Sequence, residues 1–352
     1  MCIRDRFHPY VHADSEASAA IDMLYATRAF ADENNAFYNE QIFVTGYSQG
    51  GHAAAALHRE LEENHATTLP VTASAPMSGP YSISGVMQDF IYSEEPYNFV
   101  AYLPYTLLSY QEVYGNLYND LSEIFKPVYV PMVEQFYNGT IDLNDLNAML
   151  IDQLNIDYGA PLPLRILRDD VVDDVQNDPN HPFNIALADN DVHTWAPTAP
   201  TRLYYCMADD QVPFENSVVA DSVMNALGGV NITAIDVNSA ADHGGCVEFA
   251  LLFADFFFGT FQRIDDLTNV HDPELANYFS FFPNPANDVL FIKNKKEEAW
   301  VQLIDVNGKI LLETNLTEGD NQVNIASVPT GMYFLKLRME DSFFTKKVLI
   351  QK

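Results

Sequence analysis

A serine, a pair of aspartates and a histidine follow one another in this sequence in an order that could support nucleophilic catalysis. Ser48 stands in Gly46-Tyr47-Ser48-Gln49-Gly50, where glycines two residues before and after the serine let a strand and a helix approach closely. A serine hydroxyl is a weak nucleophile, so it needs a base to take its proton and an acid to orient that base. Asp209 or Asp210, and then His243, follow in the order that these roles require. The pattern predicts acyl transfer through a covalent intermediate on Ser48.

His243 is the histidine whose place in the chain fits the base. It follows the strand that comes after the two aspartates and stands at the start of the last apolar helix, whereas the other histidines lie in loops, in polar segments or on the helix after Ser48. That helix also presents its first free main-chain N–H, that of Gln49, where an oxyanion would form. Gln49 is therefore the expected oxyanion donor.

Alternating strands and helices must position these residues. Asp14 and Ser15 are N-cap candidates for the first helix. Such alternation is typical of an α/β fold with a parallel sheet. The expected helices cover residues 14–34, 52–61 and 215–227, and the expected strands cover residues 41–45, 71–76, 201–206 and 231–237.

More than a hundred residues separate the second and third expected strands, too many for an ordinary connection, so a helical cap is expected over about residues 84–198. Most of its apolar and tyrosine side chains should pack the cap itself, and a minority should line an acyl or aromatic pocket over Ser48. The acidic run 169–174 lacks the spacing of a calcium loop, so a solvated surface is expected there, and no metal or cofactor. The tyrosines concerned are Tyr92, Tyr97, Tyr102, Tyr105, Tyr110, Tyr114 and Tyr118.

Two cysteines flank the candidate acid and base. Cys206 precedes Asp209 by three residues, and Cys246 follows His243 by three. Because the acid and base must touch, a disulfide between these cysteines and two buried thiols both remain open. A disulfide would fit an exported protein.

The charge is distributed unevenly along the 352 residues. The formal net charge is −31, which disfavours binding to nucleic acid and to anionic lipid headgroups. Residues 279–352 carry nine basic and nine acidic residues, so the excess belongs to the preceding segment. This shift marks a domain boundary, with a linker expected at residues 265–278. The longest apolar stretch, Val247–Phe261, is too short to cross a membrane and is expected to be a core helix of a soluble chain.

The two ends of the chain differ in kind. Residues 1–6 resemble a spurious leader found at the start of some open reading frames, and we exclude them from the fold. From residue 279 onward, six or seven short alternating strands with Gly- and Pro-containing turns predict a small β-sandwich without a catalytic or metal-binding set.

Residues 7–264 resemble the α/β-hydrolase family, specifically secretory lipases and esterases and their prolyl-oligopeptidase-like relatives. The resemblance implies that Ser48 attacks an acyl carbonyl, that His243 moves the proton, and that Asp209, which begins the Asp-x-x-Val-Pro spacing, orients His243. The family would place further strands and a second oxyanion donor before residue 7, so the isolated chain is expected to be unstable or nearly inactive in an esterase assay. The matching segments are His8-Pro9-Tyr10, Gly46-Tyr47-Ser48-Gln49-Gly50-Gly51, Ser78-Gly79-Pro80-Tyr81, Asp209-Asp210-Gln211-Val212-Pro213 and Asp242-His243-Gly244.

Residues 279–352 resemble the C-terminal sorting domain of the type IX secretion system of Bacteroidota. The resemblance implies that this domain is an export address for the secretion machinery and that the upstream enzyme is secreted or held at the cell surface. It rests on Phe282-Pro283-Asn284-Pro285-Ala286, Asp305-Val306-Asn307-Gly308-Lys309, Gly331-Met332-Tyr333-Phe334-Leu335-Lys336 and the segment 346–352.

The sequence therefore predicts a secreted serine hydrolase that cleaves small-molecule or lipid carboxylic esters. Two alternatives remain: a serine peptidase of the prolyl-oligopeptidase type, and a binding module without activity. The peptidase is disfavoured because residues 1–278 hold only nine basic residues from which to build a subsite for a peptide.

Overall fold

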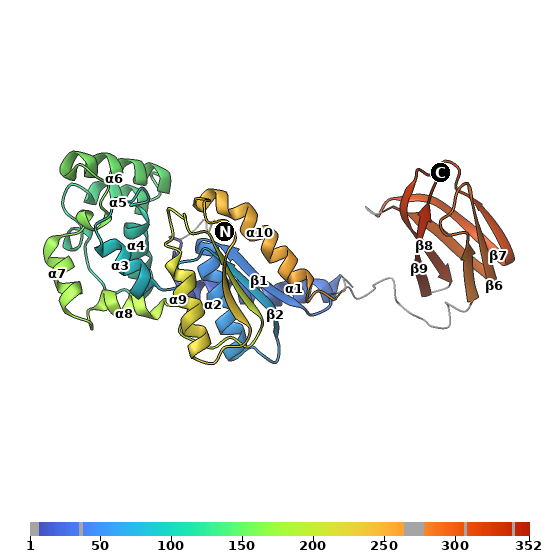
Figure 1. The fold of residues 1–352 in the computed structure, drawn as a ribbon, viewed down its shortest axis with the longest axis horizontal. Helices are drawn as coiled ribbons and strands as arrows, with labels where there is room; N and C mark the ends of the chain where they lie inside the picture. The colour runs from blue at the N-terminus through green and yellow to red at the C-terminus, as the bar shows by residue number, and fades with distance from the viewer. Residues whose placement is uncertain (1–6, 35–37, 264–277, 306–307, 340–341) are drawn as a thin grey trace. The chain divides into compact units, whose positions relative to one another are not determined.

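The computed structural model describes residues 7–34, 38–263, 278–305, 308–339 and 342–352. The chain forms two compact units, Met1–Gln262 and Arg263–Lys352 (Figure 1). The expected leader and residues 265–277 of the expected linker lie outside the described residues.

The first unit contains a four-stranded parallel sheet, as predicted. Its strands β1 (Ile42–Tyr47), β2 (Val71–Met77), β3 (Thr201–Tyr205) and β4 (Ile232–Asp236) lie side by side in sequence order. Because the strands are parallel and each is followed by a crossover, their carboxyl ends meet at one edge of the sheet. The segments that begin with Ser48, Asp209 and His243 follow β1, β3 and β4 at this edge.

Helices cover both faces of this sheet. Alternate residues of a strand point to opposite faces, so Leu203 packs with α1 (Ala13–Glu33), α2 (Gln49–Asn64) and α9 (Glu215–Ala226), while Tyr204 packs against α10 (His243–Gly259). α1 begins after His12, whose Nδ1 accepts the N–H of Ser15 at 3.2 Å. The prediction that Asp14 or Ser15 caps this helix is therefore wrong by two or three residues.

α10 differs from the core helix that the apolar stretch predicted. It lies on the sheet through its small side chains, Ala250 and Ala254, which let the helix approach closely. Phe257 and Phe258 also pack against this core, but several large side chains stand away from it, and Phe256 is 67% exposed. Periodicity could not reveal this arrangement because the stretch is apolar all round. Among the described residues, no helix is both long and apolar enough to span a membrane.

A helical insertion separates β2 from β3, as predicted for the cap (Figure 1). Its helices enclose a hydrophobic core of their own, centred on side chains such as Phe125, Leu146 and Leu150. The acidic run belongs to a helix whose exposed Asp169 pairs with Lys126 at 2.7 Å. The cap comprises a π-helical turn (Ile83–Met87), α3 (Gln88–Tyr92), α4 (Tyr102–Tyr114), α5 (Val130–Tyr137), α6 (Leu143–Tyr158), α7 (Asp169–Asn177), α8 (Pro182–Asp189) and 3-10 turns at Leu121–Glu123 and Pro163–Ile166.

The second unit is an antiparallel sheet around its own core. Five strands are described rather than six or seven, because two pairs of expected strands are each continuous, with a register irregularity between Asn294 and Glu298. Leu290, Val301 and Leu335 are among its buried side chains. The strands are β5 (Phe279–Phe282), β6 (Val289–Ile304), β7 (Ile310–Asn324), β8 (Gly331–Met339) and β9 (Ser342–Ile350).

Glu62 anchors α2 to the segment that leads into β3. Its carboxylate accepts hydrogen bonds from His58 Nε2 at 2.9 Å, from the Thr198 N–H at 2.7 Å and from the Ala199 N–H at 2.7 Å. Burial by itself would raise the pKa of Glu62. These hydrogen bonds outweigh that effect and lower the pKa to about 2. Glu62 therefore stabilises the fold above pH ~4.5, and the contribution is lost as the pH falls towards 2.

Glu62→Gln should lower the free energy of unfolding by about 2 kcal/mol at pH 7 and by much less at pH 2.5. Urea unfolding across this pH range, followed by Trp195 fluorescence in a Trp300→Phe background, measures the difference. Trp195 reports on the first unit because its ring lies 4.9 Å from that of His58. A difference that stays constant from pH 7 to pH 2.5 would contradict the prediction.

Candidate active site

Ser48 occupies a strained turn between β1 and α2. Its backbone has φ 60° and ψ −123°, a conformation that costs energy for a residue with a side chain. The Ser48 N–H donates to the carbonyl of Met77 at 2.9 Å, which ties the turn to the end of β2. Strain of this kind is typical of a nucleophile turn between a strand and a helix.

Two glycines make the turn possible, but they are not the two that the motif indicates. A Cβ on Gly46 would lie 2.0 Å from the carbonyl oxygen of Gly50, so β1 and α2 could not approach as they do. A Cβ on Gly50 would meet nothing within 4 Å, whereas one on Gly51 would lie 2.4 Å from the Met77 carbonyl. The second steric requirement therefore falls on Gly51 rather than on Gly50.

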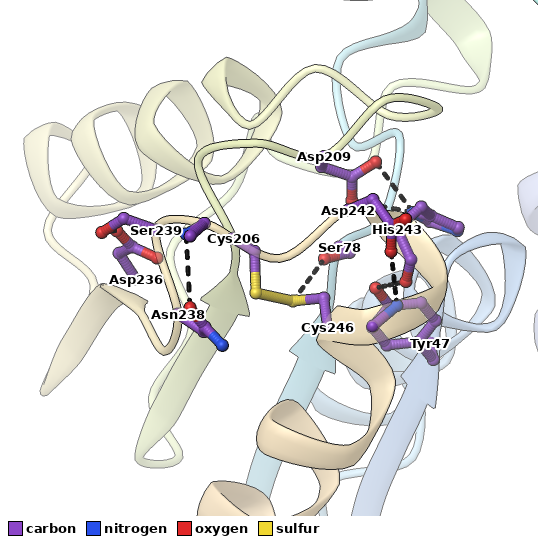
Figure 2. Close-up of a disulfide and its surroundings, with 12 residues drawn as sticks. Tyr47, Ser78, Cys206, Asp209, Asp236, Asn238, Ser239, Asp242, His243 and Cys246 are labelled. Carbon is purple, nitrogen blue, oxygen red and sulfur yellow. Dashed lines mark hydrogen bonds and ion pairs between the residues drawn. A yellow bond between two sulfur atoms is a disulfide. The ribbon is translucent and has the colours of Figure 1, made fainter.

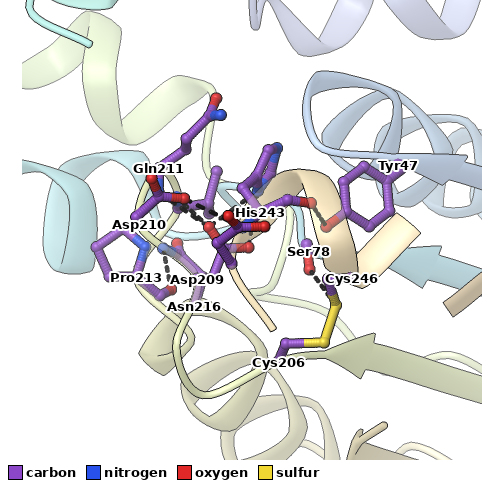
Figure 3. Close-up of polar contacts among 12 residues, drawn as sticks. Tyr47, Ser78, Cys206, Asp209, Asp210, Gln211, Pro213, Asn216, His243 and Cys246 are labelled. Atoms are coloured by element: carbon purple, nitrogen blue, oxygen red, sulfur yellow. Dashed lines mark hydrogen bonds and ion pairs between the residues drawn. A yellow bond between two sulfur atoms is a disulfide. The ribbon is translucent and has the colours of Figure 1, made fainter. Parts of the chain in front are cut away.

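The structure brings Asp209 and His243 into direct contact (Figure 3). The Nδ1 atom of His243 lies 2.7 Å from Oδ2 and 2.9 Å from Oδ1 of Asp209, and their side chains are 8% and 1% exposed. Asp209 Oδ1 also accepts the N–H groups of Gln211 and Val212 at 3.0 and 2.9 Å. An ionised carboxylate accepts hydrogen bonds only, so Nδ1 carries the imidazole proton and Nε2 is left to act as a base.

Asp210 has a contact that the sequence did not indicate. The sequence offered Asp210 only as an alternative acid, but its Oδ1 accepts the main-chain N–H of His243 at 3.1 Å. This residue remains exposed. The two adjacent aspartates therefore hold His243 by its ring and by its backbone.

Tyr47 connects the serine turn to the histidine (Figure 2). Its hydroxyl donates to the main-chain oxygen of His243 at 2.6 Å, and the two rings lie 5.0 Å apart. Burial raises the pKa of Tyr47 to about 12, so the hydroxyl remains a donor at neutral pH. Sequence reasoning missed this contact, although an aromatic residue next to the nucleophile was a visible signal.

Cys206 and Cys246 form a disulfide in the structure (Figure 2). The sequence left two alternatives open, a disulfide and two buried thiols, and the structure contains the disulfide. It joins the residue after β3 to the first turn of α10, and both cysteines are fully buried. The bond connects the segment that carries Asp209 with the helix that begins at His243.

Gln49 is the first residue of α2 and lies beside Ser48. Its main-chain N–H has no acceptor among the described residues, as expected at a helix N-terminus, and can therefore serve a ligand oxygen. Its side chain contacts two groups to which the sequence assigned no role: Gln49 Nε2 lies 2.9 Å from Glu16 Oε1 and 2.9 Å from His8 Nε2.

Ser48 and Gln49 open onto an apolar cavity that the cap largely builds. It encloses about 1110 Å³ between protein atoms, its open mouth included, and no charged side chain is among its lining residues. Of the seven tyrosines in question, Tyr92, Tyr97 and Tyr102 line the cavity. The valines of α7 and apolar residues of α3, α4 and α8 complete it, namely Val171, Val172, Val175, Ile91, Leu103, Leu107, Phe183 and Leu187.

The described residues contain no candidate metal site. No group of three or more His, Cys, Asp or Glu side chains that could hold an ion occurs in the described ranges.

The sheet and the helices of the first unit have the α/β-hydrolase fold. The structure resembles the rice cell wall degrading esterase LipA from Xanthomonas oryzae (26% identity, TM-score 0.62, covering 73% of this chain and 67% of that one). It also resembles a Legionella pneumophila protein described as a hydrolase (26% identity, TM-score 0.65, 74% and 67% covered). The closed state of Candida antarctica lipase A shares the fold at 15% identity (TM-score 0.55, 73% and 57% covered).

The second unit matches a known domain family. Residues 280–351 match the secretion system C-terminal sorting domain, which indicates that the chain is exported, either secreted or attached to the cell surface. No curated protein matches the chain by sequence.

Proposed function

We propose that the first unit is a serine hydrolase that cleaves carboxylic esters. The observation that carries the proposal is the buried Asp209–His243 pair beside the strained Ser48 turn, at the edge of the sheet where the strands end. The likeness to esterases supports an ester hydrolase in particular.

The proposed reaction has two balanced steps. The Ser48 hydroxyl oxygen attacks the acyl carbonyl while His243 Nε2 takes its proton, and the Gln49 N–H receives the oxyanion. Collapse of this intermediate breaks the ester bond, and His243 returns the proton to the departing alcohol. Water then attacks the acyl-enzyme by the same route, which releases the acid and restores Ser48. Asp209 keeps the His243 tautomer and stabilises the cation that forms.

The cavity favours an ester with an apolar acyl group. A peptide substrate carries main-chain polar groups and often a charged terminus, and burying a charge without a partner is costly. The cavity lining offers no charged side chain to pair with such a terminus. Its apolar walls instead suit an acyl chain or an aromatic acid, whose burial yields about 25 cal/mol per Å².

A fluorophosphonate probe tests the proposal. The intact Asp209–His243 contact leads us to expect activity in place of the unstable or nearly inactive chain that the resemblance implied. The full chain should be labelled on the peptide that contains Ser48, as mapped by mass spectrometry, and heat-unfolded protein should not be labelled. Hydrolysis of p-nitrophenyl acyl esters should exceed that of prolyl p-nitroanilides at equal concentration. Absence of labelling would favour the inactive binding module, and faster hydrolysis of the anilides would favour the peptidase.

A further inference from the structure

A second histidine–carboxylate pair lies directly behind the nucleophile turn. His52 Nδ1 lies 2.7 Å from Glu16 Oε2, and the two side chains are 0% and 6% exposed. The other ring nitrogen of His52, Nε2, lies 2.9 Å from the main-chain oxygen of Asn190. The pair thus joins α1 and α2 to the end of the cap helix α8.

The hydrogen-bond partners determine where the protons reside. A main-chain oxygen can only accept, so His52 Nε2 carries a hydrogen, and the other ring nitrogen shares a proton with Glu16. The His52–Glu16 pair therefore carries one more proton than a neutral imidazole and an ionised carboxylate would carry together. Charge on Glu16 is balanced within the pair, as a buried carboxylate requires.

The remaining oxygen of Glu16 holds Gln49. The Gln49 amide nitrogen donates one hydrogen to Glu16 Oε1 and the other to His8 Nε2, each at 2.9 Å. His8 accepts this bond as a neutral ring, and burial lowers its pKa, which favours the neutral form. Both hydrogens of the Gln49 amide are therefore used, and its side chain has one orientation.

We propose that Glu16, held by the buried His52, is a positioning residue that fixes Gln49 and with it the main-chain N–H that receives the oxyanion. This inference rests on the proposed function, because an oxyanion forms only if Ser48 attacks an acyl group. Gln49 and His52 stand one turn apart on α2, so Glu16 grips the helix start at two points. A shift of about 1 Å in a stabilising group can cost on the order of a hundredfold in rate.

Glu16→Ala should lower kcat by about tenfold to a hundredfold while the KM for a p-nitrophenyl ester changes by less than about threefold. The rate constant for fluorophosphonate labelling of Ser48 should fall by the same factor, because the adduct places an oxygen in the oxyanion position. Glu16→Gln should retain most of the rate: its oxygen can still accept from Gln49, and its amide can donate to a neutral His52.

Gln49→Met provides a second variant that leaves the Glu16–His52 pair in place. It removes the amide that Glu16 holds but keeps the main-chain N–H, and it should reduce kcat to a similar extent. The double variant should be no slower than the slower single variant, because both remove the same interaction.

Glu62→Ala is the matched control, since it breaks another histidine–carboxylate pair of α2, His58–Glu62. It should lower stability but leave kcat within about twofold of the wild type. The inference is overturned if Glu16→Ala leaves kcat unchanged, if Glu62→Ala lowers kcat equally, or if Glu16→Gln is as slow as Glu16→Ala. A wild-type chain that the probe does not label at Ser48 would instead refute the proposed function, and the inference with it.

Discussion

Replacing Asp209 with asparagine should lower kcat for ester hydrolysis by about ten-thousandfold. The two carboxylate oxygens now face Nδ1 of His243 at 2.7 and 2.9 Å, and both accept. An asparagine at this position can direct its NH₂ group towards Nδ1, which makes Nδ1 an acceptor and moves the ring proton to Nε2. A ring protonated at Nε2 cannot take the proton of Ser48, although the fold and the cavity are unchanged.

Asp210→Asn is the matched control for this prediction. The Asp210 side chain accepts the His243 N–H at 3.1 Å, and an asparagine oxygen can make the same bond. Its kcat should therefore stay within about threefold of the wild type. Steady-state kinetics with a p-nitrophenyl ester separates the outcomes: an Asp210 variant slower than the Asp209 variant would transfer the role of the acid to Asp210.

Deleting residues 279–352 should abolish export of the hydrolase in a bacterium that has a type IX secretion system, and the protein should accumulate in the periplasm. The deletion removes the region that matches the secretion system C-terminal sorting domain. This region has its own hydrophobic core, which shares no residue with the cores of the first unit. Its removal should leave the first unit folded, so loss of export would reflect loss of the address rather than misfolding.

Immunoblots of the periplasmic fraction, the cell surface and the medium measure this outcome. The full chain with Ser48→Ala is the control, because a sorting signal in the second unit does not depend on the nucleophile of the first. This control should be exported like the wild type. Equal export of the deleted and intact chains would show that another segment carries the address.

The fold class could be predicted because it depends on local patterns that repeat along the chain. The segments around β1, β2, β3 and β4 are short and apolar, and each is separated from the next by a helix or by the cap. The change in charge before residue 279 predicted a domain boundary. The parallel sheet and the helical insertion agree with those predictions, whereas two pairs of expected strands in the second unit are each continuous, with an irregular register between Asn294 and Glu298.

The candidate site was predictable only in part. Ser48, Asp209 and His243 follow strand ends, so their order and spacing were informative, and their catalytic roles stay a prediction. Glu16 and His52 carried no comparable signal, and the position of Tyr47 next to Ser48 did not indicate what its hydroxyl contacts. Nothing in the spacing indicates that a hydroxyl reaches a main-chain oxygen 196 residues away, or that two helices meet through one buried carboxylate.

The sequence by itself determined the turn around Ser48, the alternation of strands and helices, and the change from an acidic segment, residues 1–278, to a neutral one, residues 279–352, because each depends on neighbouring residues and their composition. Only the tertiary structure decided which tyrosines line the cavity, which face of α10 stays exposed, and that Glu16 and His52 stand behind Gln49. These features depend on how distant segments pack, and many side chains of similar chemistry could have filled the same places. Shape and the pairing of buried polar atoms decide which side chain fills each place, and both arise only in the folded chain.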